Sequence, residues 1–572
     1  MSHDSEPAAP RFEAEPPPAA ARAGTWGDAG DSELGALSIA SAATIILLGN
    51  VTSRLLGLVR EQVMAWLFGA TGGTDAFVVA AAVPTMVYDL LVGGAITAAL
   101  VPVFVDYAAP EQAARLWRVV SVVFNLTALA LGAVVLILIA LAPWVIQVLG
   151  AGFAPGQQAQ TVLMTRVLLL AVVLQGLAGV AMAVLYARQR FALPAFAVAV
   201  YNGGIIVGAL ALHQWLGVTS LVVGVLLGAF GQLALQAPGL RGMVYRPVLD
   251  LHLPEIRAII RLYAPVAAGM VVTIAGIVID RNLASHLEPG SITVMGYATR
   301  LIQFPLGLVA TAVGYAVLPT LARYASEERE GRPGSSQGYR STLLLGVRLV
   351  LLLMLPAMVG LIVLREPLIR LLFERGAFNP ADTARTAATF LAYAPQLPFT
   401  ALDQLLIFAF YARKDTRTPV LIGVLGVGVY LATALALLGP WRVVGLATAN
   451  AVQNSVHGIV LFALLQRRIG GLVNPALASF VGRALAAALG MGGALVLAHG
   501  AWARLLPAGG TLALGLELVV LLGLGAAVYL ALAETFGLRE SRMLWRLARA
   551  RLSRPRGHVE EGPHAVPGIP EA

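Results

Sequence analysis

Four polar side chains share one helical face inside the first long apolar segment of the chain: Ser53, Arg54, Arg60 and Glu61. At about 100° per residue, Arg54 and Glu61 lie on one stripe of a helix, and Ser53 and Arg60 lie on the neighbouring stripe. A charged side chain in a bilayer core costs about 2.5–3.5 kcal/mol on insertion scales, so it usually faces a cavity or a substrate path. This face suits an anionic, oxygen-rich ligand. The alternative is that the arginines lie at the membrane boundary and reach lipid headgroups.

Two more charged residues extend this hypothesis. Asp75 follows the glycine-rich turn 69–73 and opens the second apolar segment. It would either pair with Arg54 or Arg60 as an outer gate, or act only as a helix N-cap, which Asp favours. Arg300 lies within a later apolar segment and would add a third guanidinium, because arginine binds phosphate groups bidentately. The alternative for Arg300 is a structural ion pair.

Three acidic residues inside apolar segments are candidates for binding a coupling cation, Na⁺ or H⁺: Asp280, Asp403 and Glu517. Asp280 has an alternative role, since it could simply neutralise the adjacent Arg281. The chain has no GxxxxGK[ST] phosphate loop and no HExxH motif, and its eight histidines show no metal-ligand spacing. We therefore expect no enzyme activity, no resident metal and no cofactor other than such a cation.

The composition points to a membrane protein. Of 572 residues, 58% are hydrophobic and 12% are charged, and the mean hydropathy is +0.81. Soluble globular proteins carry about twice that charged fraction. Fourteen apolar segments approach or exceed the length of about 20 residues that spans a bilayer. The sequence therefore predicts an all-α polytopic membrane protein with fourteen transmembrane helices. The absence of cysteine excludes disulfides and thiolate metal sites.

The basic residues indicate an orientation. The net charge is +9, and the arginines lie mostly at segment ends, which suits anchoring and orientation better than nucleic-acid binding. Connections that would be cytoplasmic carry most of them, whereas the first four connections on the other side, near 70–74, 149–159, 214–218 and 287–291, contain none. We predict that both termini are cytoplasmic, in a multi-pass protein of the plasma membrane that binds no nucleic acid.

An internal repeat divides the chain. Leu185-Tyr186-Ala187-Arg188 with Pro194 parallels Phe410-Tyr411-Ala412-Arg413 with Pro419, and the same offset of 225 residues relates 150–153 to 375–378. Six segments per repeat give two copies of the same orientation, with a site between them. Chance similarity of apolar sequence is the alternative. The expected divisions are a disordered tail (1–33), an N-lobe with segments 1–6 (34–240), a C-lobe with segments 7–12 (241–468), two additional helices (469–540), and a basic, then disordered tail (541–572).

Several stretches together resemble the MurJ (MviN) family of lipid II flippases. They are SRLLGLVREQVMAWLFGATGGTDAFVVAAAVP, GGAITAALVPVF, YATRLIQFPLGLVATAVGYAVLPTLARYA, LFERGAF and FYARKDTRTP. The similarity runs in order over about residues 36–540. It places the chain in the superfamily of multidrug, oligosaccharidyl-lipid and polysaccharide exporters.

This resemblance implies a function and a set of site residues. The function is movement of lipid II, an undecaprenyl-diphosphate-linked disaccharide-pentapeptide for peptidoglycan synthesis, from the inner to the outer leaflet by alternating access. The alternative is transport of another anionic lipid-linked glycan. The family's cavity arginines fall on Arg54, Arg60 and Arg300, with Ser53 beside them; Glu61 would set their positions, Asp75 would form the gate, and segments 13 and 14 would line a groove for the lipid tail. We expect lipid II and membrane lipids as its partners, and a monomer.

Two positions depart from the family pattern. Tyr88 stands where another cavity arginine is expected, followed by Asp89, and Gln303 stands where an acidic residue is expected three positions after Arg300. The sequence therefore predicts an arginine clamp shared by two lobes but smaller than the family's usual one.

Overall fold

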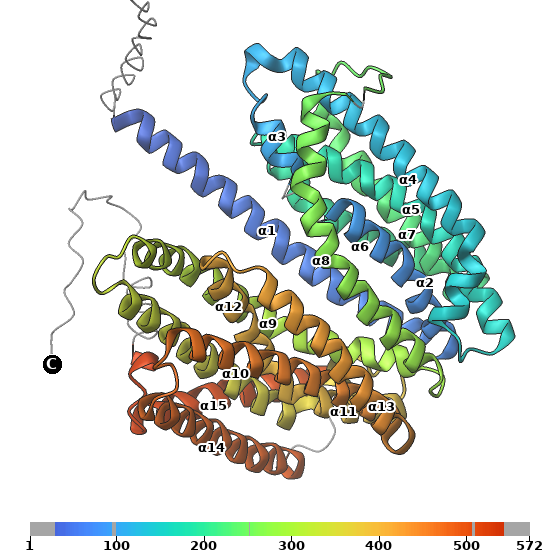
Figure 1. The fold of residues 1–572 in the computed structure, drawn as a ribbon. Coiled ribbons are helices and arrows are strands. Elements are labelled where there is room, and N and C mark those ends of the chain that lie inside the picture. Colours follow the sequence, from blue (N-terminus) through green and yellow to red (C-terminus); the bar gives the residue numbers. More distant parts are fainter. Residues whose placement is uncertain (1–28, 94–98, 251, 506–509, 543–572) are drawn as a thin grey trace, which may run out of the picture.

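Every regular element that the structure describes is a helix. The computed structural model describes residues 29–93, 99–250, 252–505 and 510–542, and no β-strand occurs within these ranges (Figure 1). The predicted all-α class is therefore confirmed. Most of the two expected tails lies outside the described residues, although residues 29–33 already belong to the first helix.

The first half of the chain forms the N-lobe. Its helices are α1 (Ala29–Phe68), α2 (Gly72–Tyr88), α3 (Val101–Val105), α4 (Ala113–Leu149), α5 (Pro155–Ala187), α6 (Ala192–Leu216) and α7 (Ser220–Gln236). A π-helical turn, Asp89–Gly93, continues α2, and short 3₁₀ turns lie at Pro110–Gln112, Gly217–Thr219 and Ala237–Leu240. Pro84 lies within α2, and a proline inside a helix favours a bend.

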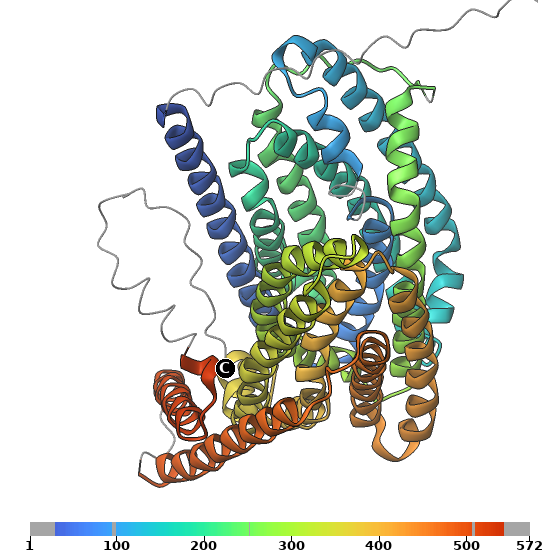
Figure 2. The same cartoon turned by 60° about the vertical axis from the view of Figure 1, so that its left-hand side comes forward.

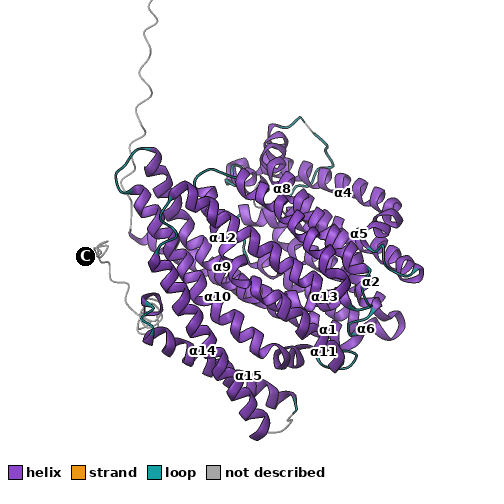
Figure 3. Ribbon diagram, turned by 60° about the horizontal axis from the view of Figure 1, so that its bottom comes forward, coloured by secondary structure: helices purple, strands orange, loops and turns teal. Residues whose placement is uncertain are grey.

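The second half forms the C-lobe and a terminal pair of helices. The C-lobe contains α8 (Pro254–Ser285), α9 (Ser291–Arg329), α10 (Ser335–Phe373), α11 (Pro380–Tyr393), α12 (Leu397–Ala412) and α13 (Arg417–Ile469), with a 3₁₀ turn at Ala394–Gln396. The terminal pair is α14 (Pro475–Leu505) and α15 (Thr511–Thr535). Figure 3 shows this pair at the edge of the molecule, beside α10.

Nine helical stretches of the described residues are long and apolar enough to cross a membrane. One of them, α13, turns at Arg442, where φ is +48° and the backbone is not helical. Another, 192–240, contains both α6 and α7. The polytopic architecture is confirmed, and the count of fourteen crossings stays a prediction.

The two lobes converge at one end. In Figures 1 and 2 the lobes lie side by side, with α1 along their boundary. Helix α8 contacts both: Glu255 in its first turn pairs with Arg115 of α4, whereas Asp280 near its end accepts a hydrogen bond from Tyr430 of α13. The N-lobe and C-lobe are therefore joined along α8 as well as at their converging ends.

Small residues bring α1 and α7 close to α6. A side chain at Gly49 of α1 would come within 2.4 Å of the carbonyl oxygen of Ala195, and one at Gly204 would come within 2.4 Å of Gly228 in α7. Close backbone approach of this kind holds helices together in a bilayer, where no hydrophobic force distinguishes helix from lipid. This packing places the polar face of α1 against Asn202 of α6.

Candidate functional site

The structure brings together three of the predicted charged residues at the boundary between the lobes. Arg60 of α1 donates a hydrogen bond from Nη2 to Oε1 of Glu61. The same oxygen lies 3.3 Å from Nε of Arg300, which comes from α9 in the C-lobe. Glu61 is 8% exposed, whereas the Arg300 side chain is 52% exposed. One nearly buried carboxylate thus links two guanidiniums from different lobes.

Asn202 of α6 fixes the position of Arg60, and sequence reasoning missed it. Its Oδ1 accepts a hydrogen bond of 3.0 Å from Nη1 of Arg60, and its Nδ2 donates to the main-chain oxygen of Ser53 at 3.3 Å. Ser53 therefore contributes its carbonyl to this arrangement. The signal was present, since Asn202 is a polar residue inside an apolar segment.

Donor atoms of this site remain available. Nε of Arg60 is buried and has no hydrogen-bond partner within the described part of the chain. Arg54 is exposed, and its guanidinium lies over Gly307 of α9. Because a guanidinium carries five N–H donors, Arg54, Arg60 and Arg300 retain the capacity to bind an anionic ligand.

Asp75 lies at the converging ends of the lobes, and its partner differs from both expectations. The carboxylate accepts hydrogen bonds from the main-chain nitrogen of Gly290 at 2.6 Å and from the nitrogen and hydroxyl of Thr293 at 2.8 and 2.7 Å. Gly290 is the N-cap residue of α9. Asp75 therefore satisfies the free N–H groups at the start of a C-lobe helix, where a negative charge is favourable.

The two sequence hypotheses about Asp75 need correction. It pairs with neither Arg54 nor Arg60, because the backbone of α9 supplies its donors. It is also not the N-cap of its own helix, since Thr71 caps α2 through a capping box with Thr74. The carboxylate of this N-lobe residue contacts the C-lobe, and its role as a gate stays a prediction.

Comparison with known proteins identifies the family. The family model described as "Lipid II flippase MurJ" matches residues 64–515. The chain belongs to the MurJ lipid II flippase family. A relative in Vibrio cholerae named "Probable lipid II flippase MurJ" is 31% identical over 519 residues, covering 88% of this chain and 95% of that one. The "Lipid II flippase MurJ" of Burkholderia cenocepacia is 29% identical, covering 74% and 83%.

Solved structures agree on the fold. "Lipid II flippase MurJ, inward closed conformation" matches with a TM-score of 0.71 at 22% identity, over 86% of this chain and 98% of that one. An inward-facing multidrug resistance MATE family transporter of the MOP superfamily matches with a TM-score of 0.60 at 15% identity, over 73% and 95%. The family is as the sequence predicted.

In this MurJ family member, the two loops at equivalent positions of the predicted repeat each form a hydrogen bond with the opposite lobe. The N-lobe loop 150–153 donates from Gly152 N to Oγ of Ser285, at the end of α8. The C-lobe loop 375–378 donates from Ala377 N to the oxygen of Trp66, at the end of α1. A third link joins Nδ2 of Asn282 to the oxygen of Val148 at 2.6 Å. These links and Asp75 close the same end of the molecule.

The three acids expected to bind a coupling cation each have a hydrogen-bond partner. Asp280 accepts from Tyr430 at 2.6 Å, as well as lying 3.8 Å from Arg281. Oδ1 of Asp403 lies 2.6 Å from Nδ1 of His457, and Oε1 of Glu517 lies 2.6 Å from Nδ1 of His499. Within the described ranges, no three His, Asp or Glu side chains gather as a metal site would need.

The residues that depart from the MurJ pattern lie on the elements predicted for them. Tyr88 ends α2 and is half-buried, and Asp89 begins the π-helical turn. Gln303 is exposed on α9, one turn beyond Arg300. Neither Tyr88 nor Gln303 is charged, so the candidate ligand-binding arginines remain Arg54, Arg60 and Arg300.

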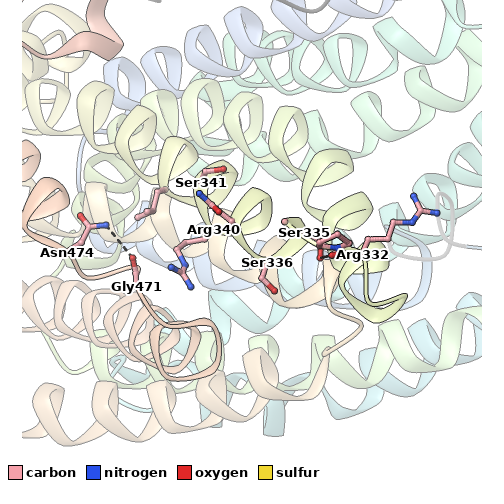
Figure 4. A pocket seen from close by; sticks show the side chains of 11 residues that line it. Arg332, Ser335, Ser336, Arg340, Ser341, Gly471 and Asn474 are labelled. Carbon is pink, nitrogen blue, oxygen red and sulfur yellow. Dashed lines mark hydrogen bonds between the residues drawn. The ribbon is translucent and has the colours of Figure 1, made fainter. Parts of the chain in front are cut away.

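A polar pocket of about 680 Å³ lies away from the arginine site, between the start of α10 and the loop that precedes α14 (Figure 4). Arg340 lines it and donates to the oxygen of Ile469, the last residue of α13. Asn474 donates to Gly471 in the same loop. The first bond joins α10 to the end of α13, and the second lies within the loop. The pocket is therefore lined by α10 and its flanking loops, away from the site between the lobes.

Proposed function

We propose that this protein moves lipid II from the inner to the outer leaflet of the bacterial plasma membrane by alternating access. Membership of the MurJ family supports the substrate. The observation that carries the mechanism is the bridge from Arg60 through Glu61 to Arg300, which joins two lobes at a site with free guanidinium donors. This role is that of a transporter, not of an enzyme.

The diphosphate of lipid II fits the chemistry of this bridge. Guanidinium groups form paired hydrogen bonds with phosphate oxygens, and such charge-assisted bonds are roughly twice as strong as neutral ones. A diphosphate would compete with Glu61 for Arg60 and Arg300, while Arg54 would add a contact from the same face of α1. Because Arg60 and Arg300 belong to different lobes, the ligand would bind one arrangement of the lobes better than another, which is the requirement for a ligand-driven shift.

The closed end of the molecule would be its outer end. The arginine distribution supports cytoplasmic termini, and α1 would then end at the outer side, where Asp75, Gly152 and Ala377 link the lobes. In this state the substrate would enter from the cytoplasmic side. Opening of these links would release it to the outer leaflet. We propose that one chain suffices for this cycle.

A cation would supply the driving force, and the carboxylate–imidazole pairs favour a proton. In the C-lobe, His457 contacts Asp403, with side chains 14% and 21% exposed. Histidine changes its charge near neutral pH. Protonation of such a pair alters the charge between α12 and α13 without a metal-binding cage. Asp280 and Glu517 are further candidates for the same role.

The decisive experiment measures lipid II on the outer leaflet of cells depleted of their own flippase. The wild-type chain should restore outer-leaflet lipid II and growth, and Arg60→Ala should abolish both while the protein remains in the membrane. Arg166→Ala is the matched control, because Arg166 is an exposed N-lobe arginine bonded to Ile139 of α4. Restored growth by Arg60→Ala would remove Arg60 from the mechanism.

The same cells test the alternative substrate. If the wild-type chain restores no outer-leaflet lipid II but increases the export of another anionic lipid-linked glycan, that glycan is the substrate. An alternative substrate that also carries a diphosphate should lose transport in the same arginine variants.

A further inference from the structure

Arg54 makes an unusual contact with the opposite lobe. A Cβ atom added to Gly307 of α9 would lie 3.1 Å from Nη2 and 3.2 Å from Nη1 of Arg54. Both terminal nitrogens of the Arg54 guanidinium therefore lie over the backbone of Gly307. Arg54 belongs to α1, so an N-lobe cation rests on the surface of a C-lobe helix.

The spacing on the two helices shows that this contact belongs to the arginine site. Arg54 and Glu61 are seven residues apart on α1, and Arg300 and Gly307 are seven residues apart on α9. Glu61 faces Arg300 and Arg54 faces Gly307, so the two helices run antiparallel in a constant register. Seven residues are almost two full turns, and each pair therefore lies on one stripe of its helix.

We propose that Gly307 is a positioning residue that provides a slot for the Arg54 guanidinium, a proposal that rests on the lipid II function above. With Arg54 in the slot, Arg54 and Arg300 present two guanidiniums on one face of α9, about 10 Å apart along its axis. The two come from different lobes. Separation of the lobes withdraws Arg54 from the slot, so the two-arginine surface for a diphosphate-linked sugar exists only while the lobes are together here.

Helix stability gives no reason for a glycine at this position. Glycine inside a helix is about 1 kcal/mol less favourable than alanine. Gly296 in the same helix has open space where a Cβ would be, so alanine fits there freely. At Gly307 an added methyl meets the Arg54 guanidinium at 3.1 Å, so the guanidinium must shift by a few tenths of an ångström. A valine fills the slot and displaces it altogether.

Two measurements on purified protein test the slot, and the first requires no substrate. Phenylglyoxal modifies arginine, and peptide-resolved mass spectrometry measures its rate at Arg54. Gly307→Val should raise the rate at Arg54 several-fold and leave Arg166 unchanged, while Gly296→Ala should match wild type at both. An unchanged rate at Arg54 overturns the slot, whatever the protein transports.

The second measurement is lipid II flipping in proteoliposomes. Gly307→Ala should lower kcat/KM a few-fold without lowering the melting temperature, and Gly307→Val should lower it about tenfold, the effect of losing one hydrogen bond to a charged group. In an Arg54→Ala background, Gly307→Val should cause no further loss, because a double-mutant cycle removes effects that act through the missing partner. Additive losses would overturn the proposal. Faster modification of Arg54 in Gly307→Val, together with a wild-type protein that flips no lipid II, would keep the slot and reject the proposed function.

Discussion

The carboxylate of Asp75 in α2 and the main-chain nitrogen of Thr293 in α9 lie 2.8 Å apart, although 218 residues separate them in the chain. The nitrogen of Gly290 and the hydroxyl of Thr293 complete the contact. An N-lobe carboxylate thus caps a C-lobe helix. The α9 helix has this cap only while the lobes are closed at this end.

Asp75→Asn should weaken the closed arrangement. The amide removes the charge, and its NH₂ group would face N–H donors if it turned toward them. Hydrogen bonds to charged groups contribute about 1.5–3 kcal/mol each, so we expect the closed state to lose about 3 kcal/mol. Double electron–electron resonance between spin labels on the two lobes would show a larger open population. Thr71→Ala is the control, because Thr71 caps α2 within the N-lobe; an equal shift in this variant would contradict a specific role for Asp75.

A disulfide across the lobe boundary near Asp75 should hold this end of the molecule closed. A Cβ placed on Gly72 would lie 3.6 Å from Cβ of Pro289, within the range that disulfides require. The chain contains no cysteine, so Gly72→Cys with Pro289→Cys creates a single pair. Oxidation should cross-link the lobes and stop transport, and a reductant should restore it. Either cysteine alone should have no redox response, and a cross-linked protein that still transports would show that this end need not open.

Helical periodicity explains which parts of the site could be predicted. The seven-residue spacing of Arg54 and Glu61 fixes them on one stripe of any helix, and the repeat places Arg300 opposite, so the sequence predicted their convergence. The partner of Asp75 was not predictable in this way, because main-chain N–H groups occur at every helix start and leave no mark in the sequence. The slot at Gly307 depends on the register between two helices 253 residues apart, and no local pattern encodes it. Asn202 did have a signal, as an amide within an apolar segment, and its partner became known only from the packing of α6 on α1.

Asn202→Leu should remove the hydrogen bond that holds Arg60 in position. Asn202 is 5% exposed, and leucine has similar size but no acceptor, so Nη1 of Arg60 would lose its partner at a cost of about 1–3 kcal/mol. We expect kcat/KM for lipid II flipping to fall about tenfold with normal membrane insertion. Asn202→Asp should also impair flipping, because a second carboxylate would neutralise Arg60. Asn125→Leu is the control, because half-buried Asn125 bonds only loop residues 246 and 248 and Tyr245; an equal loss there would make the effect unspecific.

Asp415, in the loop before α13, should confer a pH-dependent stability. Burial opposes its ionisation, but hydrogen bonds from Thr418 and the ion pair with Arg468 outweigh burial and lower the pKa of Asp415 to about 2. A carboxyl whose pKa is lower in the folded state stabilises the fold above its unfolded pKa, near 3.9, and loses this effect as the pH falls toward 2. Asp415→Ala also removes acceptors for the first N–H groups of α13, which costs about 1 kcal/mol. The melting temperature of wild type should therefore exceed that of Asp415→Ala at pH 6, with the difference shrinking below pH 4; a constant difference would contradict the ionic contribution.

Glu61→Gln should separate substrate binding from turnover. In the structure, Glu61 is the anion shared by Arg60 and Arg300, so a diphosphate must displace it from at least one guanidinium. Glutamine removes this competition, and the KM for lipid II should fall several-fold. It also removes the charge that draws the two lobes together when the site is empty, so kcat should fall as well. Glu61→Asp is the control, because it keeps the charge and loses only one methylene. A raised KM with unchanged kcat in Glu61→Gln would show instead that the carboxylate serves only to hold the arginines in place for the substrate.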